Sequence, residues 1–280
     1  MNTTRKQNRA FTLTELIVVV ALITLLSAVS LSAVAGAKAK AQRIACSSNL
    51  KQVGLAFRAW GIAHNGNTPM TLSMALGGDA EDVGMRTLSA QQKNFTTGTG
   101  SRGVSMMFLC MSNELSTPKV LFCPAEYESY YRQAATTFSG VGGGTASSVP
   151  FTNDLNVSYF IGVDAQETWP QMFLAGDHNL GGNANPPTTP FCGAPMSYSP
   201  SFAVTVGTNW VVNMGPAFMA NQHNQEGNVL MADGSVEWFN RSELQTALKK
   251  TGDSVHTSPG NFATATGTIA GAGLNRIQLP

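Results

Sequence analysis

The feature that most constrains this chain is an uncharged run from Leu16 to Ala37, in which Leu, Ile, Val and Ala dominate. A helix rises about 1.5 Å per residue, so a run of this length reaches across a hydrocarbon layer about 30 Å thick. A short leader before the run carries three basic residues, Arg5, Lys6 and Arg9. The run predicts a transmembrane helix at residues 16–37.

One acidic residue, Glu15, stands at the N-terminal edge of the run. An ionisable group near lipid is costly unless it has a partner, so Glu15 is a candidate functional residue. A local role is the alternative, because Thr12-x-x-Glu15 matches a capping box, in which the two side chains satisfy free amides at a helix start.

Residues 9–16 (RAFTLTEL) resemble the processing site of type IV prepilins and of the pseudopilins of type II secretion systems. The resemblance implies that a membrane peptidase cuts between Ala10 and Phe11 and that the new N-terminus at Phe11 is methylated. It also implies an assembly role for Glu15, the fifth residue of the mature chain. Ala10 stands where the family usually has Gly, and it keeps that position small.

An ordinary secretory signal is the competing interpretation of the same segment. Ala33-Val34-Ala35 would supply its A-x-A cleavage site, with the mature chain starting at Gly36. Secretory signals have apolar cores of about 7–15 residues, and the run here is longer, which favours the prepilin-like interpretation.

The helix is expected to continue beyond the apolar run, from about Thr14 to His64. Past Lys38, apolar residues recur at steps of four and three, which is one stripe of an amphipathic helix. These residues are Cys46, Leu50, Val53, Phe57 and Trp60. The sequence Asn-Gly-Asn-Thr-Pro at 65–69 predicts the helix end.

The remaining sequence predicts a β-rich globular domain at 67–250. Strands are expected at 119–123, 157–163, 172–175, 202–206 and 210–212, shorter helices at 104–115, 126–138 and 242–249, and a long loop from 176 to 190. The helix at 242–249 would start with a Ser242-x-x-Gln245 capping box. Two strand-like runs around Asp233-Gly234 predict a hairpin with positive φ at both turn residues.

These patterns together predict an α+β fold, and the resemblance to prepilins implies that it is pilin-like. A leader at 1–10 precedes an N-terminal helix at 11–66, of which one half lies in the membrane and the other, amphipathic half packs on an antiparallel β-rich domain. A tail rich in Gly, Ala and Thr follows at 251–280.

His223 and Asp233-Gly234 resemble a C-terminal signature, His-x9-Asp-Gly, of prepilin-like proteins of the planctomycete and verrucomicrobial type. Residues 46–55, 118–124 and 158–180 are also similar to members of that group. From the residues themselves, Asp233 and Gly234 indicate a structural turn, since Asp bonds nearby amides and Gly adopts positive φ. His223 could bond a carbonyl or a carboxylate.

The four cysteines, Cys46, Cys110, Cys123 and Cys192, form no C-x-x-C pair, so the spacing gives no support for a zinc site. Disulfides in an exported domain, with three pairings open, and buried free thiols are both consistent with the sequence. A metal cluster can also be drawn from six residues: Asp164, Glu167, Asp177, His178, His223 and Asp233. Calcium is the candidate ion, with Asp164 and Asp177 as ligands, although no spacing matches a known calcium loop.

Charge and motifs exclude other classes of function. The net charge is +1 and 12 % of residues are charged, so there is no basic field for nucleic acid. The sequence has no nucleophile elbow, phosphate-binding loop or His-Glu-x-x-His helix, and we expect no enzymatic activity.

The expected function is that of a structural subunit of a type IV pilus-like filament or a type II secretion pseudopilus. Its partners would be other copies of itself, the prepilin peptidase, an inner-membrane assembly platform and membrane lipid. Before assembly the chain would cross the inner membrane once, with its N-terminus cytoplasmic and its domain exported. The alternative is a minor tip subunit or adhesin that recognises carbohydrate or an exported substrate through loops 140–150 and 177–195.

Overall fold

A computed structural model of the chain describes residues 12–83, 103–126, 132–139, 148–182, 189–190, 204–205, 216–251 and 276–280. The side chains of residues 28–33, 35, 82, 182, 189–190, 204–205 and 221 are not described. The chain divides into two compact units, residues 1–41 and 42–280. The predicted leader, together with Phe11, lies outside the described residues.

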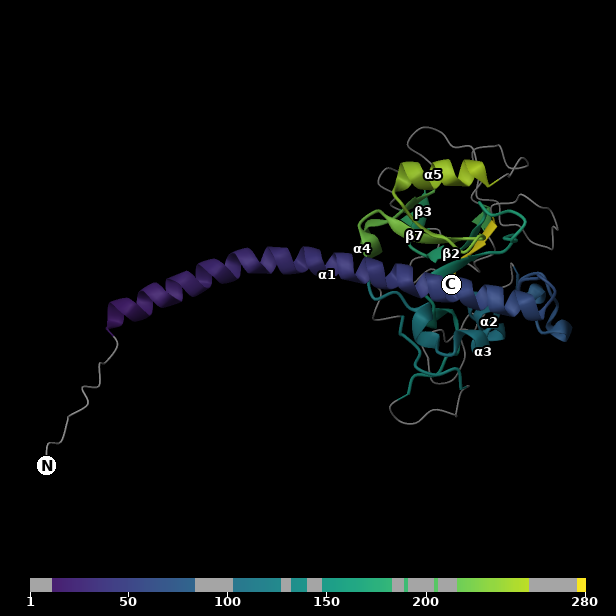
Figure 1. Ribbon diagram of the computed structural model, residues 1–280, viewed down its shortest axis with the longest axis horizontal. Helices are drawn as coiled ribbons and strands as arrows, with labels where there is room; N and C mark the ends of the chain where they lie inside the picture. The colour runs from purple at the N-terminus through teal and green to yellow at the C-terminus, as the bar shows by residue number, and fades with distance from the viewer. Residues whose placement is uncertain are drawn as a thin grey trace, which may run out of the picture. The chain divides into compact units, whose positions relative to one another are not determined.

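One helix, α1 (Leu13–Ala63), occupies the start of the chain and confirms the predicted long N-terminal helix (Figure 1). It ends where two consecutive residues, Asn65 and Gly66, have positive φ values of 58° and 81°. The amide of Gly66 donates to the carbonyl of Gly61 at 2.8 Å, which satisfies a carbonyl of the last turn. The Asn-Gly pair therefore ends the helix, as the sequence predicts.

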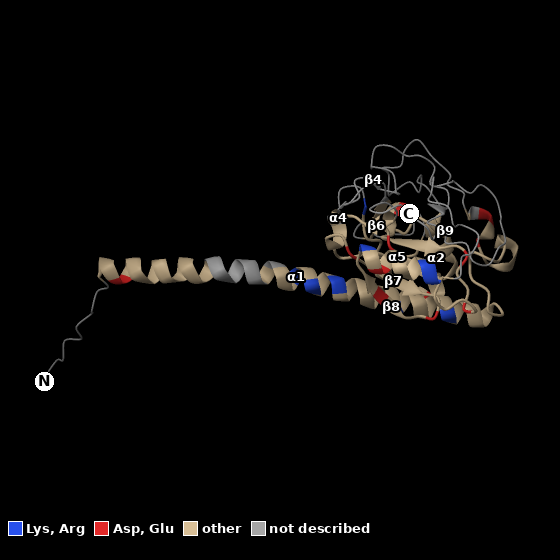
Figure 2. Ribbon diagram, turned by 90° about the horizontal axis from the view of Figure 1, so that it is seen from above, with Lys and Arg blue, Asp and Glu red and all other residues tan. Residues whose placement is uncertain are grey.

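The part of α1 in the first unit exposes apolar side chains, with Leu13 at 74 % and Leu26 at 67 % exposure. Its described residues carry one acidic position near the helix start, and basic positions appear only further along (Figure 2). Within the part of the chain that the structure describes, no helix combines the length and apolar character needed to cross a membrane. The transmembrane segment predicted at 16–37 is therefore not confirmed; the side chains of 28–33 and 35 within it lie outside the described residues.

The second unit is built on an antiparallel six-stranded sheet in the order β5-β9-β1-β2-β7-β8. In that order the strands are Val204–Thr205, Arg276–Gln278, Tyr159–Gly162, Phe173–Asp177, Gly227–Met231 and Val236–Phe239. A smaller antiparallel sheet, in the order β4-β3-β6, comprises Thr189–Pro190, Leu180–Gly182 and Ala217–Phe218. A long N-terminal helix followed by an antiparallel sheet domain confirms the α+β, pilin-like fold class.

Helices cover both faces of the larger sheet. Residues 42–63 of α1 lie between the sheet and the helices α2 (Val104–Cys110) and α3 (Ser112–Leu115) (Figure 1). The predicted stripe Cys46, Leu50, Val53, Phe57 and Trp60 is buried there. The helix α5 (Arg241–Lys250) covers the opposite face.

Side chains along the central strands alternate between the two cores. In β1, Tyr159 and Ile161 join the core that contains α1, whereas Phe160 joins the core under α5. In β7, Leu230 joins the first core, and Val229 and Met231 join the second. Successive residues of a strand point to opposite faces, so a sheet covered on both sides favours runs of consecutive apolar residues.

Several short helices connect these elements: η1 (Met74–Leu76), η2 (Ala80–Asp82), η3 (Pro118–Leu121), η4 (Asp154–Asn156) and α4 (Ala220–His223). The strand predicted at 119–123 is wrong, because Pro118 starts the single helical turn η3 after its cap Thr117. The helix predicted at 104–115 is divided at Met111 into α2 and α3. A short apolar run does not by itself distinguish a strand from a buried helical turn.

Three other predictions also differ from the structure. Residues 132–138 of the helix predicted at 126–138 are not helical, and Thr137 instead bridges to Pro150. The loop predicted from residue 176 contains the end of β2 and the strands β3 and β4. The strands predicted at 157–163 and 172–175 are confirmed as β1 and β2, and part of 202–206 as β5; the strand predicted at 210–212 lies outside the described residues.

The predicted hairpin is present as β7 and β8, but its turn is longer than expected. The amide of Gly234 donates to the carbonyl of Met231 at 2.9 Å, which places Ala232 and Asp233 at the centre of the turn. Gly234, with φ of 86°, is the only one of these turn residues with positive φ. A turn of this kind followed by one left-handed Gly is a common hairpin connection, so the prediction of positive φ at Asp233 is wrong.

The start of α5 also lies earlier than predicted. Asn240 is the N-cap and forms a capping box with Glu243, with Asn240 Oδ1 accepting from the Glu243 amide at 3.1 Å. Ser242, the predicted cap, is already inside the helix and its carbonyl accepts from Thr246 Oγ1. Asn and Ser are nearly equivalent as caps, and the strand end at Phe239 decides which is used.

Candidate functional site

The start of α1 contains the predicted capping box. The carboxylate of Glu15 accepts from the Thr12 amide at 2.9 Å and from Thr12 Oγ1 at 2.7 Å, and the Glu15 amide donates to Thr12 Oγ1 at 3.3 Å. The local role considered for Glu15 is therefore present within a single chain. Ala10 and Phe11, the predicted processing residues, lie outside the described residues.

A buried cluster of side chains that could serve as metal ligands lies in the second unit, around the disulfide between Cys46 and Cys123. Cys46 comes from α1 and Cys123 follows η3, and both are 0 % exposed. The structure thus selects one of the pairings that the sequence left open. Cys110 lies outside this disulfide, and Cys192 lies outside the described residues.

His223 and Asp177 lie beside this disulfide. His223 Nε2 is 3.3 Å from Cys123 Sγ and 3.6 Å from Asp177 Oδ2. Asp177 is the last residue of β2, and His223 ends α4. After α4, Asn224 and Gln225 adopt positive φ values and reverse the chain into β7. This reversal places His223 beside the end of β2.

The cluster formed by Cys46, Cys123, Asp177 and His223 offers four ligand atoms that all lie within 4.8 Å of one another. Among the described residues, this is the set of His, Cys, Asp and Glu side chains whose arrangement could hold a metal ion. Two of its members, Asp177 and His223, are sequence candidates. The involvement of both cysteines was not predicted, since 77 residues separate Cys46 from Cys123 and no local spacing indicates their approach.

The carboxylate of Asp177 is completely buried and only partly satisfied. Its Oδ2 accepts from the Asn228 amide at 2.7 Å and from Asn228 Nδ2 at 3.0 Å. Its Oδ1 accepts no hydrogen bond from any described residue. Burial raises the pKa of Asp177 to about 7, against the lowering effect of the two Asn228 contacts.

His223 is neutral near pH 7 in this environment. Burial and the nearby Arg43 charge lower its pKa to about 4. The 3.6 Å contact between His223 and Asp177 has the geometry of an ion pair, but it joins a neutral imidazole to the carboxyl group at neutral pH.

Charged and aromatic groups of α1 and the hairpin surround the cluster. The Arg43 guanidinium lies 3.4 Å from the ring centroid of Trp238 and donates to Glu226 at 2.5 Å. The ring of Trp238 meets His223 edge to face at 5.9 Å. These contacts attach α1 to β8 and to the segment that carries His223.

A second buried pair is formed by Glu126 and His178, the residue that follows Asp177 in the chain. His178 Nε2 is 3.0 Å from Glu126 Oε2, and both side chains are less than 10 % exposed. Burial alone would raise the pKa of Glu126, but the His178 charge and hydrogen bond outweigh it and bring the value to about 2. Of this pair, His178 is a candidate metal ligand from the sequence, whereas Glu126 was not predicted as a site residue.

The other candidate residues lie in separate contacts. Asp164 accepts two hydrogen bonds from Arg276, and Glu167 lies 3.7 Å from Arg58. Asp233 is a turn residue whose Oδ1 accepts from the Ser235 amide at 2.8 Å. Among the described residues, Asp164 does not share the cluster of Asp177, so the proposed pair of calcium ligands is not brought together. His223 and Asp233 of the His-x9-Asp-Gly signature likewise serve different structural roles.

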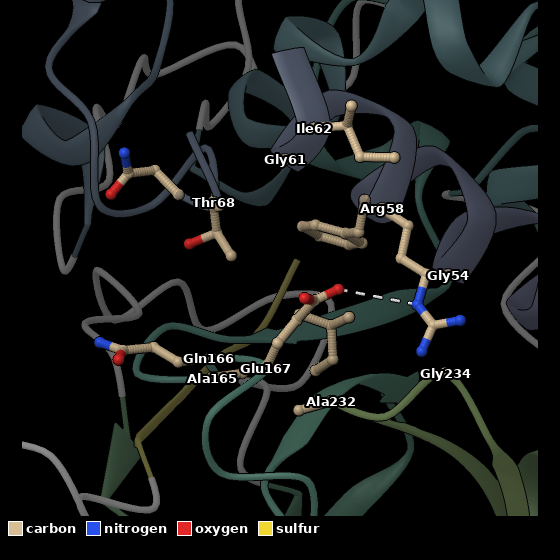
Figure 3. Close-up of a pocket in the computed structure, with 14 residues that line it drawn as sticks. Gly54, Arg58, Gly61, Ile62, Thr68, Ala165, Gln166, Glu167, Ala232 and Gly234 are labelled. Atoms are coloured by element: carbon tan, nitrogen blue, oxygen red, sulfur yellow. Dashed lines mark ion pairs between the residues drawn. The ribbon is translucent and has the colours of Figure 1, made fainter. Parts of the chain in front are cut away.

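A cavity of about 350 Å³ opens between the C-terminal part of α1 and the loops at the sheet end (Figure 3). Its walls are partly apolar, with Phe57, Ile62 and Leu174, and its rim carries the Arg58–Glu167 contact. The cavity was not predicted from the sequence, because it is formed by side chains far apart in the chain.

Comparison with known proteins identifies the N-terminal segment. Residues 5–31 match the family model described as "Prokaryotic N-terminal methylation motif". The match supports the resemblance to type IV prepilin-like proteins and pseudopilins, and it implies processing by a prepilin peptidase and filament assembly in general. It does not reach the His-x9-Asp-Gly signature. No curated protein and no solved structure matches the chain.

Proposed function

We propose that this chain, a prepilin-like protein by its N-terminal methylation motif, is a structural subunit of a type IV pilus-like filament or a type II secretion pseudopilus. The observation that carries the proposal is the position of the motif. Residues 5–31 include the start of α1, where the helix is capped and its apolar side chains are exposed. A helix surface of this kind requires a partner, either lipid or other copies of the same helix.

Assembly would bury the exposed apolar side chains of α1 between subunits. Full burial of a Leu, Ile or Val side chain is worth about 1.5–3 kcal/mol, so a few such side chains per subunit suffice to drive packing. Before assembly these side chains would lie in the inner membrane, with the N-terminus cytoplasmic and residues 42–280 exported. The Cys46–Cys123 disulfide is consistent with an exported domain, because disulfides persist in oxidising compartments. We propose no catalytic activity.

Glu15 would fix the register between subunits. After cleavage before Phe11, the carboxylate of an incoming subunit can pair with the Phe11 ammonium of a subunit already in place. An unpaired charge in a low-dielectric layer is expensive, so the paired position is favoured over others. The capping box supplies a local partner in the free subunit, and assembly would exchange that contact for the intersubunit pair.

The Glu15→Gln variant tests this function. Gln can still form a capping box, so processing and helix formation should be retained while filament yield falls. Glu237→Gln, which removes an exposed carboxylate of β8, is the matched control and should assemble normally. The measurements are mass spectrometry of the mature N-terminus and the amount of chain in sheared filaments. Normal filament yield from correctly processed Glu15→Gln would contradict the charge-pairing mechanism.

A minor tip subunit or adhesin remains the second candidate, and the cavity in Figure 3 is the observation that favours it. The loops expected to carry recognition, 140–150 and 177–195, lie partly outside the described residues. Abundance separates the two candidates, since a major subunit forms the filament bulk and a tip subunit is present in trace amounts. Quantitative mass spectrometry of purified filaments makes this measurement.

A further inference from the structure

The cluster of Cys46, Cys123, Asp177 and His223 contains the ligand types that proteins use for zinc. Thiolate and imidazole are the common zinc ligands, and a carboxylate oxygen is a regular third type. The four donor atoms lie within 4.8 Å of one another, and all four residues are buried. Calcium prefers six or more oxygen ligands, so this set of two sulfurs, one nitrogen and one carboxylate does not suit it.

The separations already present fit a tetrahedral ion. Ligand bonds of about 2.0–2.3 Å to zinc place neighbouring donor atoms about 3.3–3.8 Å apart. His223 Nε2 is 3.3 Å from Cys123 Sγ. It is 3.6 Å from Asp177 Oδ2, so the carboxylate lies beside the same point, with Oδ1 as the oxygen left for the ion. The Cα atoms of Cys46 and Cys123 are 5.3 Å apart, so both sulfurs can reach one ion once they are not bonded to each other.

The carboxylate of Asp177 supplies an independent indication of a ligand. It is 0 % exposed, and its Oδ1 accepts no hydrogen bond from the described part of the chain. A buried polar atom in that condition costs free energy unless something else satisfies it. Asn228 holds the other oxygen with its amide and its side chain, which fixes the carboxylate orientation as outer contacts do around metal ligands.

We propose that Cys46, Cys123, Asp177 and His223 bind one Zn²⁺ ion in the reduced chain, and that the Cys46–Cys123 disulfide replaces the ion in the oxidised chain. The four ligands come from α1, the segment after η3, the end of β2 and the end of α4. The ion would therefore join α1 to three parts of the sheet domain, whereas the disulfide joins it covalently to the segment after η3. The site would be structural, because all four protein ligands are used and no position remains for a substrate.

A dithiol is the reductant that would convert the oxidised chain into the reduced chain. The dithiol gives two electrons and two protons to the Cys46–Cys123 disulfide, which becomes two thiols, while the dithiol becomes a disulfide. Zn²⁺ then binds the two thiolates and releases their two protons, with no change in the oxidation state of the metal.

Cobalt binding by the full chain in detergent tests the proposal. Cys110→Ser and Cys192→Ser are introduced first, so that Cys46 and Cys123 are the only thiols. The chain is reduced with a phosphine, stripped of metal with a chelator and titrated with Co²⁺. We expect one Co²⁺ per chain, with thiolate-to-cobalt charge-transfer absorption and the intense visible bands of tetrahedral cobalt, displaced by Zn²⁺. The oxidised chain should show neither.

Matched substitutions locate the site. His223→Asn and Asp177→Asn should each weaken Co²⁺ binding at least about tenfold, the smallest effect seen even for outer-shell changes at metal sites. His64→Asn and Asp233→Asn change the same residue types outside the cluster and should leave binding unaltered. Equal affinities for His223→Asn and His64→Asn would overturn the proposal, as would absence of Co²⁺ binding by a reduced chain that retains its circular dichroism.

A second measurement applies if the reduced chain loses its fold. Zn²⁺ present during reduction should preserve the circular dichroism of the chain, and His223→Asn should abolish that protection. A reduced chain that unfolds equally with and without Zn²⁺ would refute the site.

Discussion

Removal of one partner of the buried ion pair between Asp164 and Arg276 should strongly destabilise the second unit. Arg276 Nε donates to Asp164 Oδ2 at 2.8 Å and Nη2 donates to Oδ1 at 2.5 Å, and the two side chains are 6 % and 9 % exposed. Arg276 starts β9, which lies between β5 and β1 in the sheet. The pair therefore helps to hold β9 in the sheet, next to the edge strand β5.

Arg276→Met keeps the length and apolar stem of the side chain but leaves the buried Asp164 carboxylate without the guanidinium charge. Removing one partner of a buried ion pair costs about 3–5 kcal/mol. In the double variant Asp164→Leu/Arg276→Met neither member of the pair carries a charge. Replacing a buried ion pair with well-packed apolar residues often leaves the free energy of unfolding unchanged. The double variant should thus recover about 2 kcal/mol or more relative to the sum of the single variants.

The assay is urea unfolding of the full chain in detergent, followed by tryptophan fluorescence. Glu167→Gln provides the control, since its pair with Arg58 is 3.7 Å long and more than half exposed, and exposed pairs contribute about 0–1 kcal/mol. If Arg276→Met lowered the free energy of unfolding by less than about 1 kcal/mol, as expected for an exposed pair, the reasoning from burial would be refuted.

Three further predictions address the turn, the acid response and the N-terminus. Gly234→Val should lower stability by about 1–2 kcal/mol, because its φ of 86° is unfavourable for a β-branched residue; an unchanged melting temperature would argue against the turn. The pKa of Glu126, about 2 against an ordinary 4.5, means that the folded chain binds fewer protons, so stability present above pH 4.5 should be lost between pH 4.5 and 2. Glu126→Gln should lose that part of the pH dependence in unfolding measurements, and an unaltered profile would contradict the shift. Mass spectrometry should find Phe11 at the mature N-terminus, whereas a start at Gly36 would indicate secretory cleavage.

Local patterns in the sequence predicted the elements that depend on neighbouring residues. The stripe from Cys46 to Trp60 specified α1 and its buried face, since helical periodicity is set by the backbone itself. Asn65-Gly66 ended the helix, and Asp233-Gly234 marked the hairpin, because these residue pairs favour the backbone conformations that turns need. The prepilin-like motif at residues 5–31 is likewise contiguous in the chain.

The tertiary structure alone decided which distant residues meet. Cys123 and His223 are 100 residues apart, and their contact depends on the positions of η3, β2 and α4 around one helix. The insertion of β9 between β5 and β1, and the pairing of Asp164 with Arg276, follow from the same packing. No spacing within the sequence encodes such contacts, because they result from the burial of both sheet faces rather than from local backbone preference.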